Sequence, residues 1–250
     1  MKDAPMTSTP APTLRLITFD LDGTLVDTAR EIALAANRTL VEIGFPERPL
    51  DDVTRLIGHG TRELMKGLLK HAEQSGRALQ VQALDVDHVM QVFEGHYHDT
   101  TGTDSRLYPG CLEGLRRLRD AGVAMACVTN KEHRFAERVL AVTGLTPFFD
   151  ILIGGDSLTE KKPHPLVIEH CLAAHDVLPS QAAHVGDSGI DVETARRAGV
   201  SAWAVPYGYN GGQPIEATAP DGVFAGIDRI ADHVLQSLAV PPTQETVPWP

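Results

Sequence analysis

The chain has 250 residues, of which 42% are hydrophobic and 22% charged, as expected for a globular protein with a substantial core. Its formal net charge of −11 argues against sequence-independent nucleic-acid binding, which needs a basic surface. No stretch approaches the ~18 apolar residues of a membrane span, and no secretory signal precedes the first apolar run. Three scattered cysteines indicate no disulfide framework, so we expect a cytoplasmic protein. From the charge and the lack of a long apolar stretch, we expect no nucleic-acid or membrane partner.

The first half of the chain combines one strand with a long helical block. Apolar residues that run up to an acidic turn predict a short buried strand at residues 14–20. Residues 29–43 change to helical spacing, and Gly44 stands where that helix would end. Helical patterns continue over residues 50–99, and no strand pattern interrupts them.

From residue 105 onward, helices alternate with strands. A helix is predicted between Pro109-Gly110 and Gly122, and further helices follow the strands. Apolar runs bounded by Gly, Asn and Asp predict strands at 123–130, 150–156, 182–188 and 201–208. Such alternation is typical of βαβ units around a parallel sheet, so the chain is predicted to be an α/β protein with an all-helical insert after its first strand.

Polar side chains follow the predicted strands at the point where each strand ends. Because the carboxyl ends of parallel strands meet at one edge of a sheet, we expect these side chains to share a crevice. They are Asp20 and Asp22 after the first strand, Thr129 and Asn130 after the second, Lys162 downstream of the third, and Asp187 and Asp191 after the fourth.

Carboxylates gathered in one crevice repel each other and call for a cation. Two of them about 4 Å apart repel by roughly 4 kcal/mol at an effective dielectric constant near 20. Oxygen ligands from Asp20, Asp187 and the backbone carbonyl of Asp22 suit Mg²⁺. No His or Cys group beside these aspartates has the spacing of a zinc site.

These residues also suit phosphoryl transfer. Asp20 is expected to attack phosphorus and form an aspartyl-phosphate that water then cleaves. Asp22 is expected to protonate the departing oxygen and later to deprotonate the water. Thr129 and Asn130 would hydrogen-bond the phosphoryl oxygens, and Lys162 would neutralise their charge.

Four segments resemble, in order and spacing, the motifs of the haloacid dehalogenase-like hydrolases: DLDGTLVD, VTNK, KKPHP and GDSGID. The resemblance implies a Rossmann-like catalytic core at residues 14–26 and 105–238, with a helical cap at 27–104. The segments 1–13 and 239–250 are expected to be flexible, since Pro, Ser and Thr are frequent in them.

The resemblance also assigns roles to single residues. Asp191 becomes a carboxylate that supports the metal site, although from the residues alone it could equally cap the helix that follows. The implied roles are nucleophile for Asp20, acid/base for Asp22, third-motif lysine for Lys162 with Lys161 as the alternative, and metal ligand for Asp187.

A finer resemblance points to bacterial phosphoglycolate phosphatases. It rests on the segments GGDSLTEKKPHP, YGYN and IGHGTRELM. We therefore expect Mg²⁺-dependent hydrolysis of the small ester 2-phosphoglycolate by a monomer or homodimer. In the cap, His59 and Arg62 are the residues expected to reach the substrate carboxylate, Arg62 because a guanidinium binds it in a fork. A solvated position for either side chain is the alternative.

Other functions stay open from the sequence alone. The substrate could be a sugar phosphate, a nucleotide or pyrophosphate, and a phosphosugar mutase would share all four motifs. A dehalogenase is disfavoured, because those relatives lack the second aspartate that is present here as Asp22. A catalytically inactive binding protein would be expected to have lost a motif residue, and all of them are present.

Overall fold

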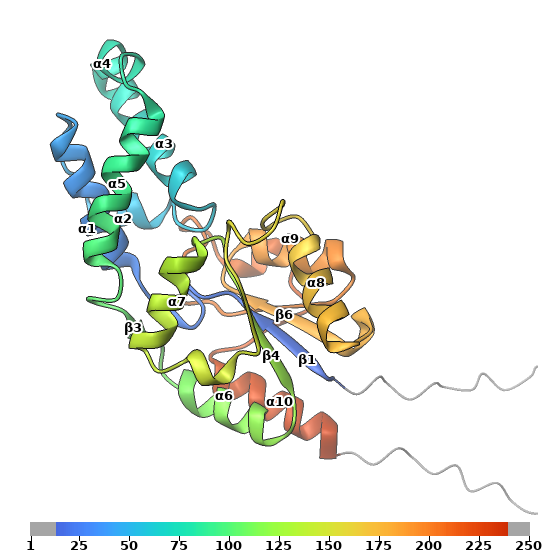
Figure 1. Cartoon of the computed structure of the whole chain (residues 1–250). Coiled ribbons are helices and arrows are strands. Elements are labelled where there is room, and N and C mark those ends of the chain that lie inside the picture. Colours follow the sequence, from blue (N-terminus) through green and yellow to red (C-terminus); the bar gives the residue numbers. More distant parts are fainter. Residues whose placement is uncertain (1–13, 240–250) are drawn as a thin grey trace, which may run out of the picture.

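The computed structural model of the chain describes residues 14–239, in which a layered sheet domain carries a bundle of helices at one end (Figure 1). The predicted flexibility of residues 1–13 and of 240–250 lies outside the described residues. Within residues 14–239, no helix combines the length and the apolar character needed to cross a membrane.

The sheet has six parallel strands in the order β5-β4-β1-β6-β7-β8. They are β1 (Leu16–Phe19), β4 (Ala124–Val128), β5 (Ile151–Ile153), β6 (Ala182–Gly186), β7 (Ser201–Ala204) and β8 (Gly222–Val223). The central strand β1 pairs with β4 and β6, and all of its residues are buried. A strand covered on both faces reads as a continuous apolar run, which is why the sequence pattern predicted it.

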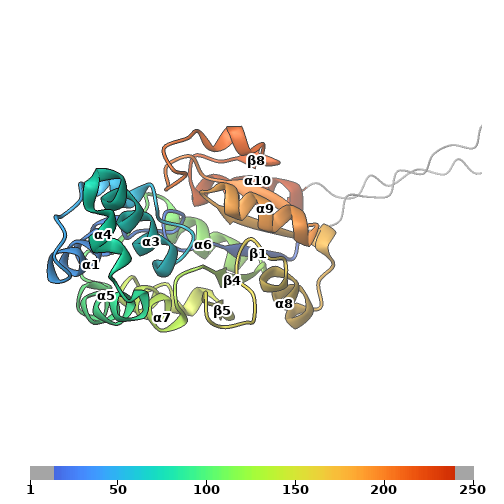
Figure 2. The ribbon, with the colours of Figure 1, turned by 90° about the horizontal axis from the view of Figure 1, so that it is seen from above.

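Helices cover both faces of this sheet (Figures 1 and 2). Ile17 and Phe19 of β1 face α6 (Cys111–Asp120), α7 (His133–Val142) and α10 (Ile227–Ala239) in one apolar cluster. Leu16 points to the other face, toward α8 (Leu166–His175) and α9 (Gly189–Ala198). Successive strand residues point to opposite faces, so a single short strand anchors both helical layers. The predicted α/β class with a Rossmann-like parallel sheet is confirmed.

The helical insert consists of five α-helices stacked beyond the sheet (Figure 1). They are α1 (Ala29–Glu42), α2 (Leu50–Thr54), α3 (Thr61–Ala72), α4 (Ala78–Gln82) and α5 (Val86–Thr100), with a kinked segment η1 (Glu73–Arg77) between α3 and α4. Leu40, Met65 and Phe93 from three of these helices share a buried apolar cluster. Since the insert has a core of its own, we propose that residues 27–104 form the cap and that 14–26 and 105–238 form the catalytic core.

Several small elements were not predicted. The chain enters and leaves the helical insert through an antiparallel pair of two-residue strands, β2 (Val26–Asp27) and β3 (Arg106–Leu107). Such strands, like β8, are too short to show a period in the sequence. Three 3₁₀ turns complete the chain: η2 (Thr146–Phe148), η3 (Pro179–Gln181) and η4 (Ile215–Thr218). The helix α10 was missed even though its buried residues Ile227, Ile230, Ala231 and Val234 have helical spacing.

Candidate active site

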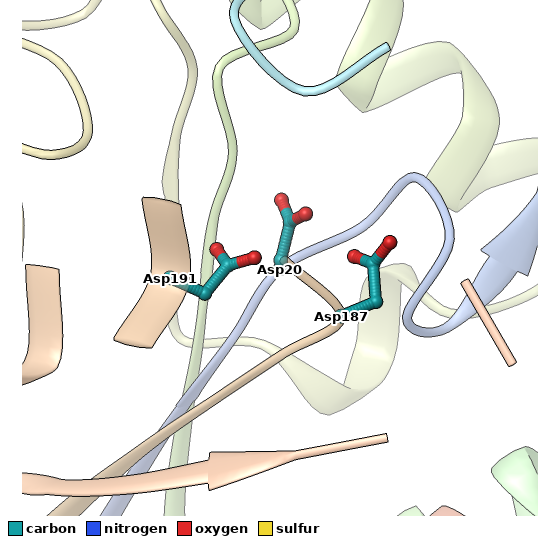
Figure 3. A group of neighbouring side chains, drawn as sticks. All are labelled: Asp20, Asp187 and Asp191. Atoms are coloured by element: carbon teal, nitrogen blue, oxygen red, sulfur yellow. The ribbon is translucent and has the colours of Figure 1, made fainter. Parts of the chain in front are cut away.

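The carboxyl ends of two neighbouring strands and the start of one helix bring the predicted acidic residues together. Asp20 follows β1, and Asp187 follows β6, the strand hydrogen-bonded to β1. Asp191 arrives from the first turn of α9. Figure 3 shows the carboxylate of Asp20 between those of Asp187 and Asp191. Each of the three offers an oxygen within 4.8 Å of the others, so the predicted convergence at one sheet edge is present.

The three carboxylates lie in a buried and electrostatically crowded place. Burial raises the pKa of Asp187 well above its usual value, and the charges of Asp191 and Asp20 act in the same direction. Burial also raises the pKa of Asp20 to about 6, although Lys162 opposes the shift. Buried acids whose ionised forms are this disfavoured provide the setting in which a bound cation is stabilising.

Lys162 is the ammonium in contact with this cluster. Its Nζ atom lies 2.7 Å from a carboxylate oxygen of Asp20 and 2.7 Å from one of Asp191, and its side chain is 2% exposed. Burial acts to lower the pKa of Lys162, but the two carboxylates outweigh it and raise the pKa. Lys161 instead donates a 2.8 Å hydrogen bond to the backbone carbonyl of His59. Lys162, and not Lys161, is therefore the lysine beside Asp20.

Asp191 caps the helix that follows it and also contacts Lys162, while its role at a metal site stays a prediction. It belongs to the capping box of α9, where its Oδ2 atom accepts from the Ser188 N–H at 3.1 Å and from the Ser188 hydroxyl at 2.6 Å. Its Oδ1 atom contacts Lys162 at 2.7 Å and His184 Nε2 at 3.2 Å. Burial alone would raise the pKa of Asp191, but Lys162 and His184 hold it well below its usual range. Asp191 thus stays ionised and holds Lys162 in place.

Asp187 is fixed by residues from two other loops. Thr24 donates a 2.9 Å hydrogen bond to its Oδ1 atom, and the backbone N–H of Tyr209 donates to Oδ2. A Cβ atom added at Gly23 or Gly208 would lie 2.4 Å or 2.2 Å from Oδ2 of Asp187. Gly23 also has a φ of +87°, which favours glycine. The backbone must therefore approach Asp187 closely on both sides.

Asp22 faces a basic residue that the sequence analysis left without a role. The Lys131 Nζ atom donates to both carboxylate oxygens of Asp22, at 2.9 and 3.1 Å. The Thr28 hydroxyl donates to one of the same oxygens at 2.6 Å. The Lys131 side chain is 1% exposed, and its Nζ lies 5.0 Å from the centroid of the Tyr97 ring. Burial acts to lower the pKa of Lys131, but Asp22, Tyr97 and Glu31 together outweigh it and raise the pKa.

The second motif places Thr129 and Asn130 at the same site. The Asn130 Nδ2 atom donates to the carbonyls of Gly58 and Lys162, both at 3.0 Å, and so ties a cap loop to the lysine loop. Asn130 Oδ1 is buried and has no partner among the described residues. The Thr129 hydroxyl oxygen accepts from the Lys131 N–H at 3.3 Å and keeps its own proton for another acceptor. Contact of either side chain with phosphate stays a prediction.

A cavity lies over these residues, between the sheet and the cap. The core contributes Asp20, Asp22, Thr129, Asn130 and Lys131, and the cap contributes Ile32, Ile57, Thr61, Leu64 and Tyr97, together with two glycines. The cap side is thus mainly apolar, and the core side carries the charge. This is the arrangement expected of a pocket for a small polar ligand.

The two cap residues predicted to reach the substrate lie outside this cavity lining. Arg62 is 49% exposed and pairs with Asp87 at 2.7 Å. The His59 side chain is exposed, and its backbone carbonyl accepts from Lys161. Their neighbours Gly58 and Thr61 do line the cavity. The structure thus shows the solvated alternative for Arg62 and His59, and a substrate contact for them stays a prediction.

The YGYN segment connects the acidic cluster to the cap. The Tyr209 hydroxyl accepts from the N–H groups of Thr28 at 2.9 Å and Ala29 at 3.0 Å, and donates to Asp27 at 2.6 Å. It thereby satisfies free N–H groups at the start of α1. Because the N–H of the same residue donates to Asp187, one tyrosine contacts both the loop after β6 and the first helix of the insert.

The comparisons with known proteins agree with this geometry. The family model for haloacid dehalogenase-like hydrolases matches residues 17–205. The phosphoglycolate phosphatase of Nitrosospira multiformis is 39% identical over 217 residues, which cover 86% of this chain and 92% of the relative. The plasmid phosphoglycolate phosphatase of Cupriavidus necator is 38% identical over 219 residues, which cover 87% of this chain and 89% of the relative. The chain belongs to the haloacid dehalogenase-like hydrolase family.

Solved structures show the same similarity. The crystal structure of a predicted phosphoglycolate phosphatase from Haemophilus somnus is 31% identical and superposes with a TM-score of 0.81. The similarity covers 88% of this chain and 97% of the chain in that crystal structure. With relatives of this kind over most of its length, the chain is a phosphatase enzyme of its family.

Proposed function

We propose that this phosphatase hydrolyses 2-phosphoglycolate to glycolate and phosphate through an aspartyl-phosphate on Asp20. The observation that carries the proposal is the buried contact of Asp20 with Lys162, beside Asp187, where Asp20 lines a cavity that core and cap residues share. The choice of ester is supported by the relatives in Nitrosospira multiformis and Cupriavidus necator, which are phosphoglycolate phosphatases.

The proposed reaction has two steps, each with a defined proton movement. A carboxylate oxygen of Asp20 bonds to phosphorus while the bond from phosphorus to the glycolate oxygen breaks, and Asp22 donates its proton to that oxygen. Asp22 then takes a proton from water, whose oxygen attacks the aspartyl-phosphate and frees Asp20. Lys162 stabilises negative charge on the phosphoryl oxygens throughout.

The acidic cluster fits Mg²⁺. Its members are all carboxylates, and hard oxygen donors are the ligands that Mg²⁺ prefers. We propose that the side chains of Asp20 and Asp187 and the backbone carbonyl of Asp22 hold the ion, while Asp191 supports the site through Lys162. When bound, Mg²⁺ supplies positive charge that offsets the repulsion between nucleophile and phosphate.

Removing the metal should therefore silence the enzyme. We expect EDTA to lower the rate of 2-phosphoglycolate hydrolysis by at least about 100-fold and added Mg²⁺ to restore it. Asp187→Asn should need a higher Mg²⁺ concentration for half-maximal activity. It should also lose the rise in melting temperature that Mg²⁺ gives the wild-type protein. A rate that chelation leaves unchanged would rule out this metal site.

The choice of substrate is tested by a panel of phosphate esters. We expect kcat/KM for 2-phosphoglycolate to exceed that for sugar phosphates, nucleotides and pyrophosphate by at least about tenfold. Product analysis with glucose 1-phosphate tests the mutase alternative, since a mutase would form glucose 6-phosphate rather than free phosphate. A better substrate elsewhere in the panel would replace 2-phosphoglycolate but keep the phosphatase activity.

We also propose that the enzyme works in the cytoplasm as a monomer or homodimer, without nucleic-acid or membrane partners. Its cysteines Cys111, Cys127 and Cys171 are free and buried, as suits a reducing compartment. The formal net charge of −11 disfavours binding to other polyanions.

A further inference from the structure

We propose that Lys131 binds the carboxylate of the substrate and thereby selects phosphate esters with a carboxylate one carbon from the ester oxygen. The inference rests on the proposed phosphatase function, in which Asp20 receives the phosphoryl group. It goes further by naming the side chain that distinguishes the acid substrate from neutral esters of the same size.

Among the described residues, 14–239, Lys131 is the one basic side chain that lines the cavity. It is almost completely buried, at 1% side-chain exposure. Ile32, Leu64 and Tyr97 line the same cavity, and Lys131 Nζ lies 5.0 Å from the centroid of the Tyr97 ring. In such surroundings water screens charge poorly, so one ammonium attracts a carboxylate more strongly than it would at the surface. A small anionic ligand is held best at this point of the cavity.

The order of groups along the cavity matches the order of groups in the substrate. Phosphorus must lie at Asp20, and the ester oxygen must lie at Asp22 to receive its proton. In 2-phosphoglycolate the carboxylate carbon is two bonds beyond that oxygen. Lys131 Nζ lies 2.9 and 3.1 Å from the two Asp22 carboxylate oxygens and lines the same cavity, so it is within reach of a group that follows the ester oxygen.

The other cations near the site already have different partners. Lys162 contacts Asp20 and Asp191, and is needed for the phosphoryl group. Arg62 pairs with Asp87 and is 49% exposed. An ammonium has three N–H donors, so Lys131 can keep a bond to Asp22 while it accepts a second carboxylate as a partner. Lys131 is therefore the group suited to the substrate carboxylate.

The test compares two esters that differ in the carboxylate. We measure kcat/KM for 2-phosphoglycolate and for ethyl phosphate, which has a methyl group in its place, and take their ratio. In Lys131→Met we expect this ratio to fall about 10- to 100-fold, the effect of losing one hydrogen bond between charged groups. The ratio is the informative quantity, because the contact of Lys131 with Asp22 affects both esters alike.

A matched control is Lys66→Met, which removes an exposed lysine paired with Glu63 in the cap and should leave the ratio unchanged. Circular dichroism and melting temperature check the fold. If Lys131→Met does not fold, Lys131→Gln, which keeps a donor for Asp22, takes its place with the same expected fall.

Two results would overturn the role of Lys131 and leave the proposed function standing. One is an equal loss for both esters in the Lys131 variants. The other is a ratio that falls in Arg62→Ala but not in Lys131→Met. A wild-type enzyme that shows no preference for 2-phosphoglycolate over ethyl phosphate would overturn both this inference and the proposed substrate.

Discussion

Replacing Asp20 by Asn should lower the turnover of both 2-phosphoglycolate and p-nitrophenyl phosphate by about 10⁴-fold or more, the scale seen when a catalytic nucleophile is removed. The amide has nearly the same shape as the carboxylate but cannot form the acyl phosphate. The loss should therefore appear in kcat for any ester, including one without a carboxylate. Steady-state rates with both substrates are the measurement.

A covalent readout separates loss of the nucleophile from a general loss of structure. After rapid acid quenching of the wild-type enzyme with substrate, mass spectrometry should find phosphate on the peptide that contains Asp20, and none in Asp20→Asn. Asp51→Asn, an exposed position in α2, is the matched control and should behave as the wild type. Residual activity above about one per cent in Asp20→Asn would remove Asp20 from the nucleophile role.

Lys162→Met should reduce both activity and stability. We expect kcat to fall by about 10³-fold, because the main positive side chain at the phosphoryl group is lost. Without Mg²⁺, the free energy of unfolding should fall by about 3–5 kcal/mol, the usual cost of removing one partner from a buried ion pair. The cost arises because Asp20 and Asp191 lose an ammonium that lies 2.7 Å from each.

Two comparisons make the Lys162 result specific. Lys161→Met changes the adjacent lysine, which contacts only the His59 carbonyl in the described residues, and should cost less than about fivefold in activity. Added Mg²⁺ should raise the melting temperature of Lys162→Met by more than it raises that of the wild type, since the ion offsets the same negative charge. Equal losses in the two lysine variants would contradict the assignment of Lys162.

The parts of the fold that could be predicted are those with local signals. The buried strand β1 is an apolar run that ends at an acidic turn, and α1 shows helical spacing up to Gly44. The two-residue strands β2 and β3 have no such signal, because their pairing joins Val26 to Leu107 across the whole cap. The helix α10 does show helical spacing of its buried residues, so it could have been predicted from the sequence as well.

The candidate site also has a part that could be predicted from the sequence and a part that could not. Each motif residue sits at a strand end or in a turn, and parallel strands place such ends at one edge, so the meeting of Asp20, Asp187 and Lys162 could be predicted. The side of the cap that faces the cavity could not be predicted. The pair of Lys131 with Asp22 joins residues 109 positions apart, and Arg62 turns to Asp87, 25 positions away.

The sequence by itself determined the α/β class, the helical insert and the identity of the acidic residues, because strand ends, turns and helical periods are properties of neighbouring residues. Only the tertiary structure decided which cation faces the cavity, which lysine touches the nucleophile and which residues close the pocket. Those choices depend on how the cap packs against the sheet, and that packing is set by contacts between distant segments such as Tyr97 with Phe135, whose ring centroids lie 4.6 Å apart.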